Sequence, residues 1–140
     1  MSGNCFIDTN ILVYAFDKSE SQKQAIAQQI LKEKGNWGKI VLSTQVLQEF
    51  FVVVTKKLTQ PLPKEIAYQV VQSLAEYPLV EINAPIILKA IHRHQTDNFS
   101  FWDALIVEAA LNAGCYVLLS EDMQENRRID SLIIQNPFSQ

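Results

Sequence analysis

The stretch that decides the fold is CFIDTNILVYAF, residues 5–16. Its first three residues are apolar, and Asp8 follows them at once. Such a short apolar run is typical of a strand that is buried on both faces of a sheet. After two more polar residues a second apolar run covers 11–16, and cap-type residues before an apolar run indicate the start of a helix. The stretch therefore predicts a buried strand that ends at Asp8, followed by a short helix.

The rest of the chain repeats this alternation of short apolar runs and amphipathic segments. Further strands are predicted at 40–42, 79–82, 116–119 and 132–134, and helices at 21–34, 44–58, 64–77, 84–91 and 101–113, with a polar loop at 92–98. Short apolar strands that are separated by helices imply a parallel sheet covered on both faces. We therefore expect an α/β protein, a three-layer α/β/α sandwich, formed by a single domain over residues 1–140.

The composition fits a folded enzyme better than a simple nucleic-acid-binding module. Hydrophobic residues make up 48% of the chain and charged residues 19%, which allows a proper core. The net charge of −3 is opposite in sign to the basic surface that such modules usually carry. The N-terminus lacks a basic region followed by an apolar stretch, and no apolar run approaches the length of a membrane span. We therefore expect a cytoplasmic protein with no membrane partner.

The two cysteines, Cys5 and Cys115, lie at the start of apolar runs or just before them. Cysteine in such a place behaves as a small hydrophobic residue, and two isolated cysteines without a histidine pair do not make a zinc site. Buried free thiols are expected.

Four carboxylates stand out by their positions: Asp8, Glu49, Asp103 and Asp122. Asp8 and Asp122 each follow a predicted strand, and ligands of parallel sheets bind beyond the carboxyl ends of the strands. Carboxylates that converge repel one another unless a cation lies between them, and hard oxygen ligands suit Mg²⁺ or Mn²⁺. The leading hypothesis is therefore a metal-dependent enzyme that acts on phosphate chemistry.

Two of these acids have an ordinary explanation as helix-capping residues. Asp8 can cap the helix that follows it, although Thr9 and Asn10 are also competent caps and would leave Asp8 free. Asp103 stands three residues after Ser100, which is the spacing of a capping box, but the box more often uses Glu or Gln.

The other two acids have an ordinary explanation as surface residues. Glu49 can belong to a solvated helix face, although its neighbours are apolar, and a partly buried Glu needs a cation or hydrogen-bond donors. Asp122 can be a turn residue, and Glu121 beside it leaves open which acid faces the site.

Other motifs that would indicate a particular catalytic or binding chemistry are absent or incomplete. No glycine-rich phosphate loop occurs. A haloacid-dehalogenase-type phosphatase needs a second Asp two residues after Asp8, where this chain has Asn10. His92 and His94 alternate in the predicted polar loop with no further ligand beside them, and are expected at the surface. The following basic residues are expected to be solvated, with a minority contacting RNA phosphates: Lys56, Lys57, Arg93, Arg127 and Arg128.

The segments around the four acids resemble the PIN-domain family and, within it, the VapC-like toxin ribonucleases of bacterial toxin–antitoxin pairs. They occur in the right order and together span nearly the whole chain. The matching segments are 6–17, 42–50, 100–107 and 118–124, and the ending 136–138 looks like the same branch.

The resemblance implies a PIN-like fold with a five-stranded parallel sheet, an acidic pocket that binds Mg²⁺ or Mn²⁺, and endonucleolytic cleavage of RNA. It also implies a homodimer and a cognate antitoxin protein that blocks the groove. It assigns catalytic and metal-site roles to Asp8, Glu49, Asp103 and Asp122, and pocket-orienting roles to Thr9, Asn10 and Ser120.

The roles of the four acids need not be equal. Asp8 and Asp103 are expected to hold the metal most directly, with Asp122 close by and partly through water. Glu49 is the best candidate to orient or deprotonate the attacking water.

One departure from the family pattern lies after Gln124, where a glycine is frequent and this chain has residues 125–127. Asn tolerates positive φ better than most residues, so Asn126 is expected to form the turn.

Two alternatives share the fold: a PIN-domain nuclease in RNA processing, and a degenerate PIN domain that binds RNA or protein without cleaving. The presence of all four acids counts against the second. The sequence names neither the RNA target nor the antitoxin, and it does not choose between Mg²⁺ and Mn²⁺ or between one metal and two.

Overall fold

A computed structural model of the chain describes residues 4–35 and 39–139, and its described part contains one six-stranded sheet. The strands are ordered β3-β2-β1-β4-β6-β5, and they pair in parallel except for β5, which is antiparallel to β6. The bounds are β1 Cys5–Ile7, β2 Ile40–Ser43, β3 Leu79–Val80, β4 Val117–Leu119, β5 Arg128–Ile129 and β6 Leu132–Gln135. The predicted parallel sheet of five strands is confirmed.

The sixth strand, β5, was not predicted. It has two residues, of which Arg128 is exposed, so it carries no apolar signal of its own. It forms because the chain turns back on β6 through Asp130, whose φ of 53° lies in the left-handed region that Asp tolerates. Such a hairpin is fixed by turn geometry rather than by hydrophobic pattern.

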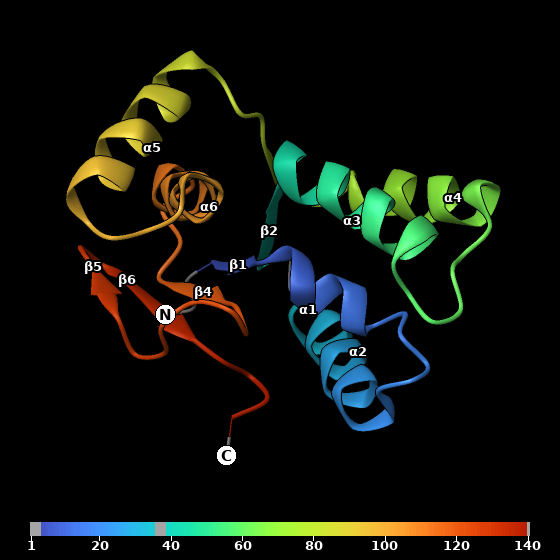
Figure 1. Ribbon diagram of the computed structural model, residues 1–140. Coiled ribbons are helices and arrows are strands. Elements are labelled where there is room, and N and C mark those ends of the chain that lie inside the picture. The colour runs from blue at the N-terminus through green and yellow to red at the C-terminus, as the bar shows by residue number, and fades with distance from the viewer. Residues whose placement is uncertain (1–3, 36–38, 140) are drawn as a thin grey trace.

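Within the described residues, six helices cover the two faces of the sheet (Figure 1). Four of them, α1 to α4, lie on one side, where α3 packs against α1 and α4, while α5 packs against α6 on the other side. The bounds are α1 Thr9–Tyr14, α2 Ser21–Gly35, α3 Thr44–Lys56, α4 Lys64–Leu74, α5 Ala84–Thr96 and α6 Phe101–Asn112. The predicted three-layer α/β/α sandwich is therefore confirmed.

The crossovers reverse direction at the centre of the sheet. From β1 the chain moves outward to β2 and β3, then returns across the other face to β4, which pairs with β1. The carboxyl ends of β1 and β4 therefore form a switch point, where ligands of open α/β sheets bind. Behind this edge α6 is buried almost throughout, from Ala104 to Ala110, which fixes its first turn against the sheet.

The helix caps largely agree with the sequence. Ser43, Asn83 and Ser100 each accept a hydrogen bond from a backbone N–H of the first turn, and Gly114 ends α6 with a φ of 70°. The turn expected at Asn126 is confirmed by its φ of 68°. Cys5 and Cys115 are buried free thiols, as predicted.

Several predicted boundaries were wrong. The first helix begins at Thr9 rather than at residue 11, the third strand is shorter than 79–82, and α4 ends at Leu74 rather than at 77. The polar loop predicted at 92–98 is mostly the last turns of α5, with the exposed His92 and His94 on it.

That part of α5 stays helical because its polar side chains have partners. Arg93 pairs with Asp97, one turn later, and with the buried Glu108 of α6. Arg127 lies over the ring of Phe99 and donates to the carbonyl of Asp97. The expectation that Arg93 and Arg127 are merely solvated was therefore wrong.

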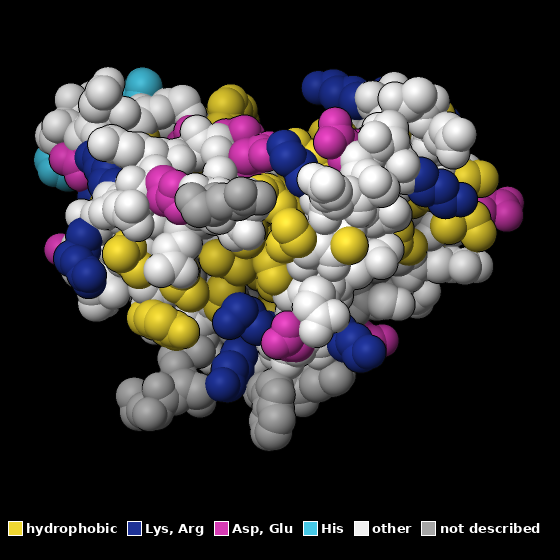
Figure 2. Space-filling view, turned by 90° about the horizontal axis from the view of Figure 1, so that it is seen from below, with side chains coloured by type: hydrophobic (Ala, Val, Ile, Leu, Met, Phe, Trp, Pro, Cys, Tyr) yellow, Lys and Arg dark blue, Asp and Glu magenta, His cyan; other side chains and the backbone are white. Residues whose placement is uncertain are grey.

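The surface carries charges of both signs. Figure 2 shows basic and acidic side chains interspersed on one face, around a hollow in which hydrophobic side chains are exposed. None of the helices in the described part of the chain is both long and apolar enough to cross a membrane.

Candidate active site

All four predicted carboxylates line one cavity at the switch point. The cavity has a volume of about 690 Å³ and lies between the ends of β1 and β4, helix α3 and the start of α6. The acids that line it are Asp8, Glu49, Asp103 and Asp122, together with the more distant Asp17. The structure thus brings together residues that are up to 114 positions apart in the chain.

Asp8 is both a helix cap and a wall of the cavity. Its side chain accepts a hydrogen bond from the backbone N–H of Thr9 at 2.7 Å, and its other oxygen accepts from the hydroxyl of Ser120, also at 2.7 Å. The prediction that Thr9 or Asn10 would release Asp8 from capping was wrong, because α1 begins at Thr9 and makes Asp8 its N-cap. The cap fixes the carboxylate in place.

Asp8 is deeply buried without a cation beside it. Burial raises the pKa of its carboxyl to about 6; the hydrogen bonds from Ser120 and Thr9 oppose the rise, and the negative charges of Asp103 and Glu49 add to it. Within the described part of the chain, no Lys or Arg pairs with any of the four acids. Bound protons or a bound cation are the two ways to relieve such a site.

Asp103 shows the same pattern in a more open position. It stands in the first turn of α6, where its backbone N–H donates to the Ser100 hydroxyl at 3.1 Å. Burial raises the pKa of its carboxyl, Ser100 opposes the rise, and Asp122 and Glu49 add to it by charge repulsion. The capping-box position and the cavity position are therefore compatible.

Glu49 projects from α3 and is held at both oxygens. The Thr9 hydroxyl donates to one oxygen at 2.6 Å, and the side-chain amide of Gln45 donates to the other at 3.1 Å. The same amide also donates to the carbonyl of Trp102, directly before Asp103. Gln45 thus ties α3 to the start of α6 and is a positioning residue that sequence reasoning missed. Its only signal was its place one helical turn before Glu49.

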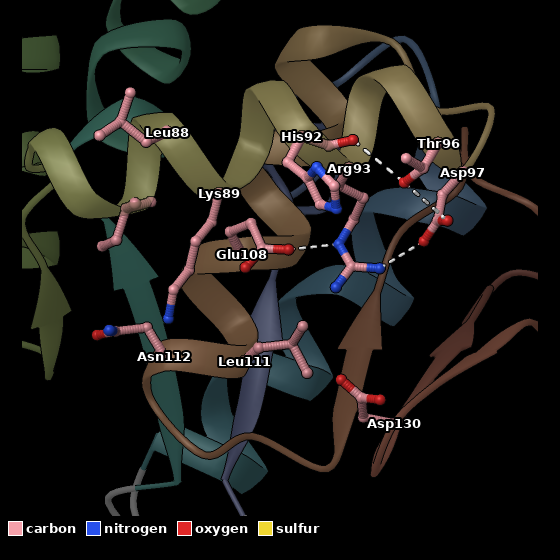
Figure 3. Close-up of a pocket in the computed structure, with 11 residues that line it drawn as sticks. Leu88, Lys89, His92, Arg93, Thr96, Asp97, Glu108, Leu111, Asn112 and Asp130 are labelled. Atoms are coloured by element: carbon pink, nitrogen blue, oxygen red, sulfur yellow. Dashed lines mark hydrogen bonds and ion pairs between the residues drawn. The ribbon is translucent and has the colours of Figure 1, made fainter.

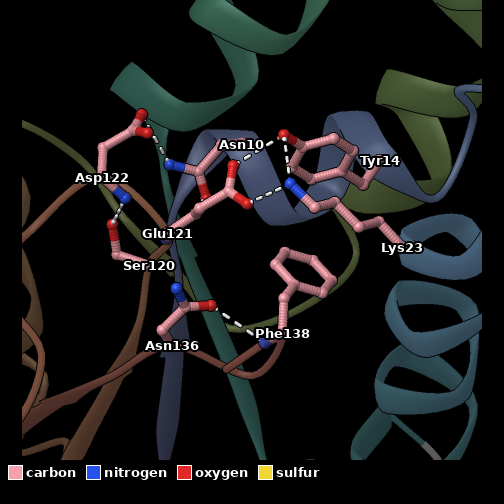
Figure 4. A network of polar contacts seen from close by, with 8 residues as sticks. All are labelled: Asn10, Tyr14, Lys23, Ser120, Glu121, Asp122, Asn136 and Phe138. Carbon is pink, nitrogen blue, oxygen red and sulfur yellow. Dashed lines mark hydrogen bonds and ion pairs between the residues drawn. The ribbon is translucent and has the colours of Figure 1, made fainter. Parts of the chain in front are cut away.

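Asp122 is positioned by Asn10 (Figure 4). The side-chain amide of Asn10 donates to the Asp122 carboxylate at 2.9 Å, and its oxygen accepts from the backbone N–H of Glu121 at 3.3 Å. The backbone N–H of Asp122 donates to the Ser120 hydroxyl. Asn10 thus contacts the Asp122 carboxylate and Ser120 contacts the Asp8 carboxylate, while the pocket-orienting roles that the resemblance implies for them stay a prediction.

Glu121 faces away from the cavity. Its carboxylate accepts from the Tyr14 hydroxyl at 2.6 Å and pairs with Lys23 of α2 (Figure 4). Lys23 also lies over the rings of Tyr14 and Phe138, which brings the C-terminal segment into the same cluster. Of these two adjacent acids, therefore, Asp122 lines the cavity and Glu121 does not.

The donor set suits a hard divalent cation. It consists of carboxylate oxygens with excess negative charge, which Mg²⁺ and Mn²⁺ prefer. Among residues 4–35 and 39–139, however, no three acidic, histidine or cysteine side chains are gathered closely enough to enclose an ion. Hydrogen bonds to Ser120, Thr9 and Asn10 hold the carboxylates along the walls instead.

Comparison with known proteins places this architecture in a family. The PIN-domain model matches residues 5–130, and the chain therefore belongs to the PIN-domain family. Comparison with curated proteins finds no significant match.

Solved structures with the same fold include toxins and toxin–antitoxin complexes. A toxin–antitoxin complex from Klebsiella pneumoniae matches with a TM-score of 0.70 at 18% identity, covering 96% of this chain and 98% of that chain. VapC20 of Mycobacterium tuberculosis, described as a toxin that cleaves the sarcin–ricin loop, matches at 0.67 and 15% identity, covering 82% and 87%. VapBC2 of Rickettsia felis, bound to promoter DNA, matches at 0.60 and 21% identity, covering 94% and 97%. These likenesses establish a shared fold.

Proposed function

We propose that the chain is a metal-dependent endoribonuclease and the toxin of a type II toxin–antitoxin pair. The observation that carries the proposal is the cavity at the switch point, in which four carboxylates meet and form no ion pair with any basic side chain that the structure describes. Membership in the PIN-domain family and the fold shared with VapC toxins support it. The substrate is RNA, and the reaction is hydrolysis of a phosphodiester bond.

The four carboxylates have different proposed roles. Asp8, Asp103 and Asp122 provide the oxygens that would hold Mg²⁺ or Mn²⁺, with Glu49 beside them. The bound ion supplies a Lewis acid that neutralises phosphate charge and lowers the pKa of a water. Glu49, held by Thr9 and Gln45, presents a carboxylate that can accept a proton from water in the cavity.

The proposed partners follow from the same comparisons. Solved structures that share the fold are toxin–antitoxin complexes, which supports a cognate antitoxin as a protein partner. A homodimer and a cytoplasmic location belong to the same proposal. Two alternatives are a PIN nuclease of RNA processing and a PIN domain that binds without cleaving, and the assay below distinguishes the second of them from the proposal.

The test is cleavage of total cellular RNA by the purified protein with Mg²⁺, Mn²⁺ or EDTA. Wild-type protein should cut RNA at discrete sites only with a metal, and Asp8→Asn and Asp103→Asn should lower the rate by about a thousandfold or more. Asp130→Asn is the matched control, because Asp130 lies in the β5–β6 turn and Asn also tolerates its positive φ. Normal turnover of either cavity variant would contradict the assignment, and folded wild-type protein without metal-dependent cleavage would favour the binding-only alternative.

A further inference from the structure

We propose that Lys57 binds a phosphate of single-stranded RNA other than the phosphate that is cleaved. The proposal rests on the proposed function, because it concerns how the same cavity holds its substrate. It makes Lys57 a substrate-binding residue, which neither the family match nor the comparisons assign.

The first observation is a row of side chains along α3. Glu49, Val53 and Lys57 all line the cavity, and they are spaced four residues apart, which places them on one face of the helix. Lys57 caps the C-terminal end of α3 with helical φ and ψ, so the row continues to that residue. At 1.5 Å rise per residue, Glu49 and Lys57 stand about 12 Å apart along the axis.

The second observation is charge. Of the side chains that line the described cavity, five are acidic, and Lys57 is the one with a positive charge. Its ammonium group has no hydrogen-bonded or ion-paired partner among residues 4–35 and 39–139, and its side chain is exposed. A cavity walled by acids repels a polynucleotide, and Lys57, which lies about two turns of α3 beyond Glu49 in a cavity that Asp17 also lines, is placed to offset that repulsion.

The third observation is the wall between the two ends. Three valines line the cavity, of which Val13 of α1 is buried, Val53 of α3 is half-buried and Val52 of α3 is 43% exposed; Val52 and Val53 lie between Glu49 and Lys57 along α3. The exposed apolar side chain of Val52 suits the face of a base or a sugar rather than a phosphate. Nucleotides in a stacked strand rise by about 3.4 Å each, so about 12 Å exceeds one nucleotide step. Lys57 therefore reaches a different phosphate from the one at the carboxylates.

A purely structural role for Lys57 makes a different prediction. A lysine in the last turn of a helix also stabilises the helix dipole. Lys56 is its neighbour and is also exposed at the same helix end, but it does not line the cavity. The two lysines are thus a matched pair that separates helix stabilisation from substrate binding.

The experiment measures binding of fluorescein-labelled single-stranded RNA by anisotropy in EDTA, over a range of KCl concentrations. Lys57→Gln should weaken binding by about tenfold at low salt. It should also reduce the slope of log K against log salt by about 0.7, the value for one phosphate contact on a single strand. Lys57→Arg should bind as the wild-type protein does, and Lys56→Gln should change neither quantity. In the cleavage assay with metal, Lys57→Gln should raise KM and leave kcat near the wild-type value.

Each outcome decides the proposal. Equal losses for Lys56→Gln and Lys57→Gln would overturn it in favour of diffuse surface charge, and wild-type binding by Lys57→Gln would overturn it outright. If wild-type protein cleaves RNA and Lys57→Gln has an unchanged KM, the proposal fails while the nuclease function stands. If wild-type protein neither binds nor cleaves RNA, the nuclease function fails and this proposal with it.

Discussion

Two cavities of this molecule are almost equal in volume, about 690 Å³ at the switch point and about 680 Å³ between α5 and α6. Each contains a deeply buried carboxylate: Asp8 is 6% exposed and Glu108 is 7% exposed. Glu108 pairs with Arg93, which also pairs with Asp97 (Figure 3). Asp8 has hydrogen-bond donors but no cation, and other acids face it. Volume and burial therefore do not distinguish the two cavities, whereas charge pairing does.

The difference separates structural charge from functional charge. A buried carboxylate with an arginine partner has its ionisation compensated inside the fold. A buried carboxylate without a cationic partner is destabilised by the loss of hydration, and the charges of neighbouring acids add to this; a proton or a cation relieves it, and strongly perturbed acids of this kind mark functional sites. Neutralising Glu108 and neutralising Asp8 should consequently have opposite effects on stability.

The largest expected effect is at the paired carboxylate. Glu108→Gln leaves Arg93 with one partner instead of two and should lower the free energy of unfolding by about 3 kcal/mol. Urea denaturation at pH 7.5 measures this loss. A decrease of less than about 1 kcal/mol, as expected for an exposed ion pair, would contradict the claim that the pairing of Glu108 with Arg93 stabilises the fold.

The effect at Asp8 should be smaller and of opposite sign. Its carboxyl pKa is about 6 in the folded protein against 3.8 in the reference state, so the folded state binds its proton more tightly. Stability contributed by this group is therefore lost as pH rises from about 4 to about 6. In EDTA at pH 7.5, Asp8→Asn should raise the free energy of unfolding by about 2 kcal/mol: the pKa shift corresponds to about 3 kcal/mol, a weaker hydrogen bond with Ser120 offsets about 1 kcal/mol of it, and Asn still caps α1.

The pH dependence is the control for this second prediction. At pH 4 the stabilisation by Asp8→Asn should largely vanish, because the folded wild-type protein then carries a protonated Asp8. Urea denaturation at both pH values measures it. A variant that is less stable than the wild-type protein at pH 7.5 would show that the Asp8 charge is compensated after all.

The smallest effect concerns the orientation of Asp122. Asn10→Ala removes the amide that donates to Asp122 and should weaken Mn²⁺ binding by about tenfold while the carboxylates remain. Asn112→Ala, in the cavity between α5 and α6, is the matched control and should bind Mn²⁺ normally. If the two variants bind Mn²⁺ with equal affinity, the hydrogen bond from Asn10 to Asp122 does not contribute to metal binding.

Much of the fold could be predicted because the central strands β1, β2 and β4 are fully buried and almost entirely apolar. The positions of Asp8 and Asp122 followed from the same pattern, since both stand just beyond a parallel strand. The pattern did not predict that Glu49 and Asp103 lie in the same cavity, because the spacing of residues within each helix does not determine how α3 and α6 pack. Those two were placed by their resemblance to a family.

The missed features depend on partners that are distant in the sequence. Glu108 interrupts a buried helix much as Glu49 interrupts an apolar stretch, so local pattern does not tell a structural acid from a functional one. The partner of Glu108 is Arg93, in a segment that was predicted to be a loop. Gln45 was overlooked because its contact with the Trp102 carbonyl joins two helices.

The most direct test of the central claim is titration of the metal-free protein with Mn²⁺ at pH 7.5 by isothermal titration calorimetry. We predict that wild-type protein and Asp130→Asn bind Mn²⁺ with the same affinity, and that Asp8→Asn and Asp103→Asn bind it far more weakly or not at all. Absence of binding to the folded wild-type protein, or unchanged binding to Asp8→Asn, would contradict the claim that the unpaired carboxylates form a cation site.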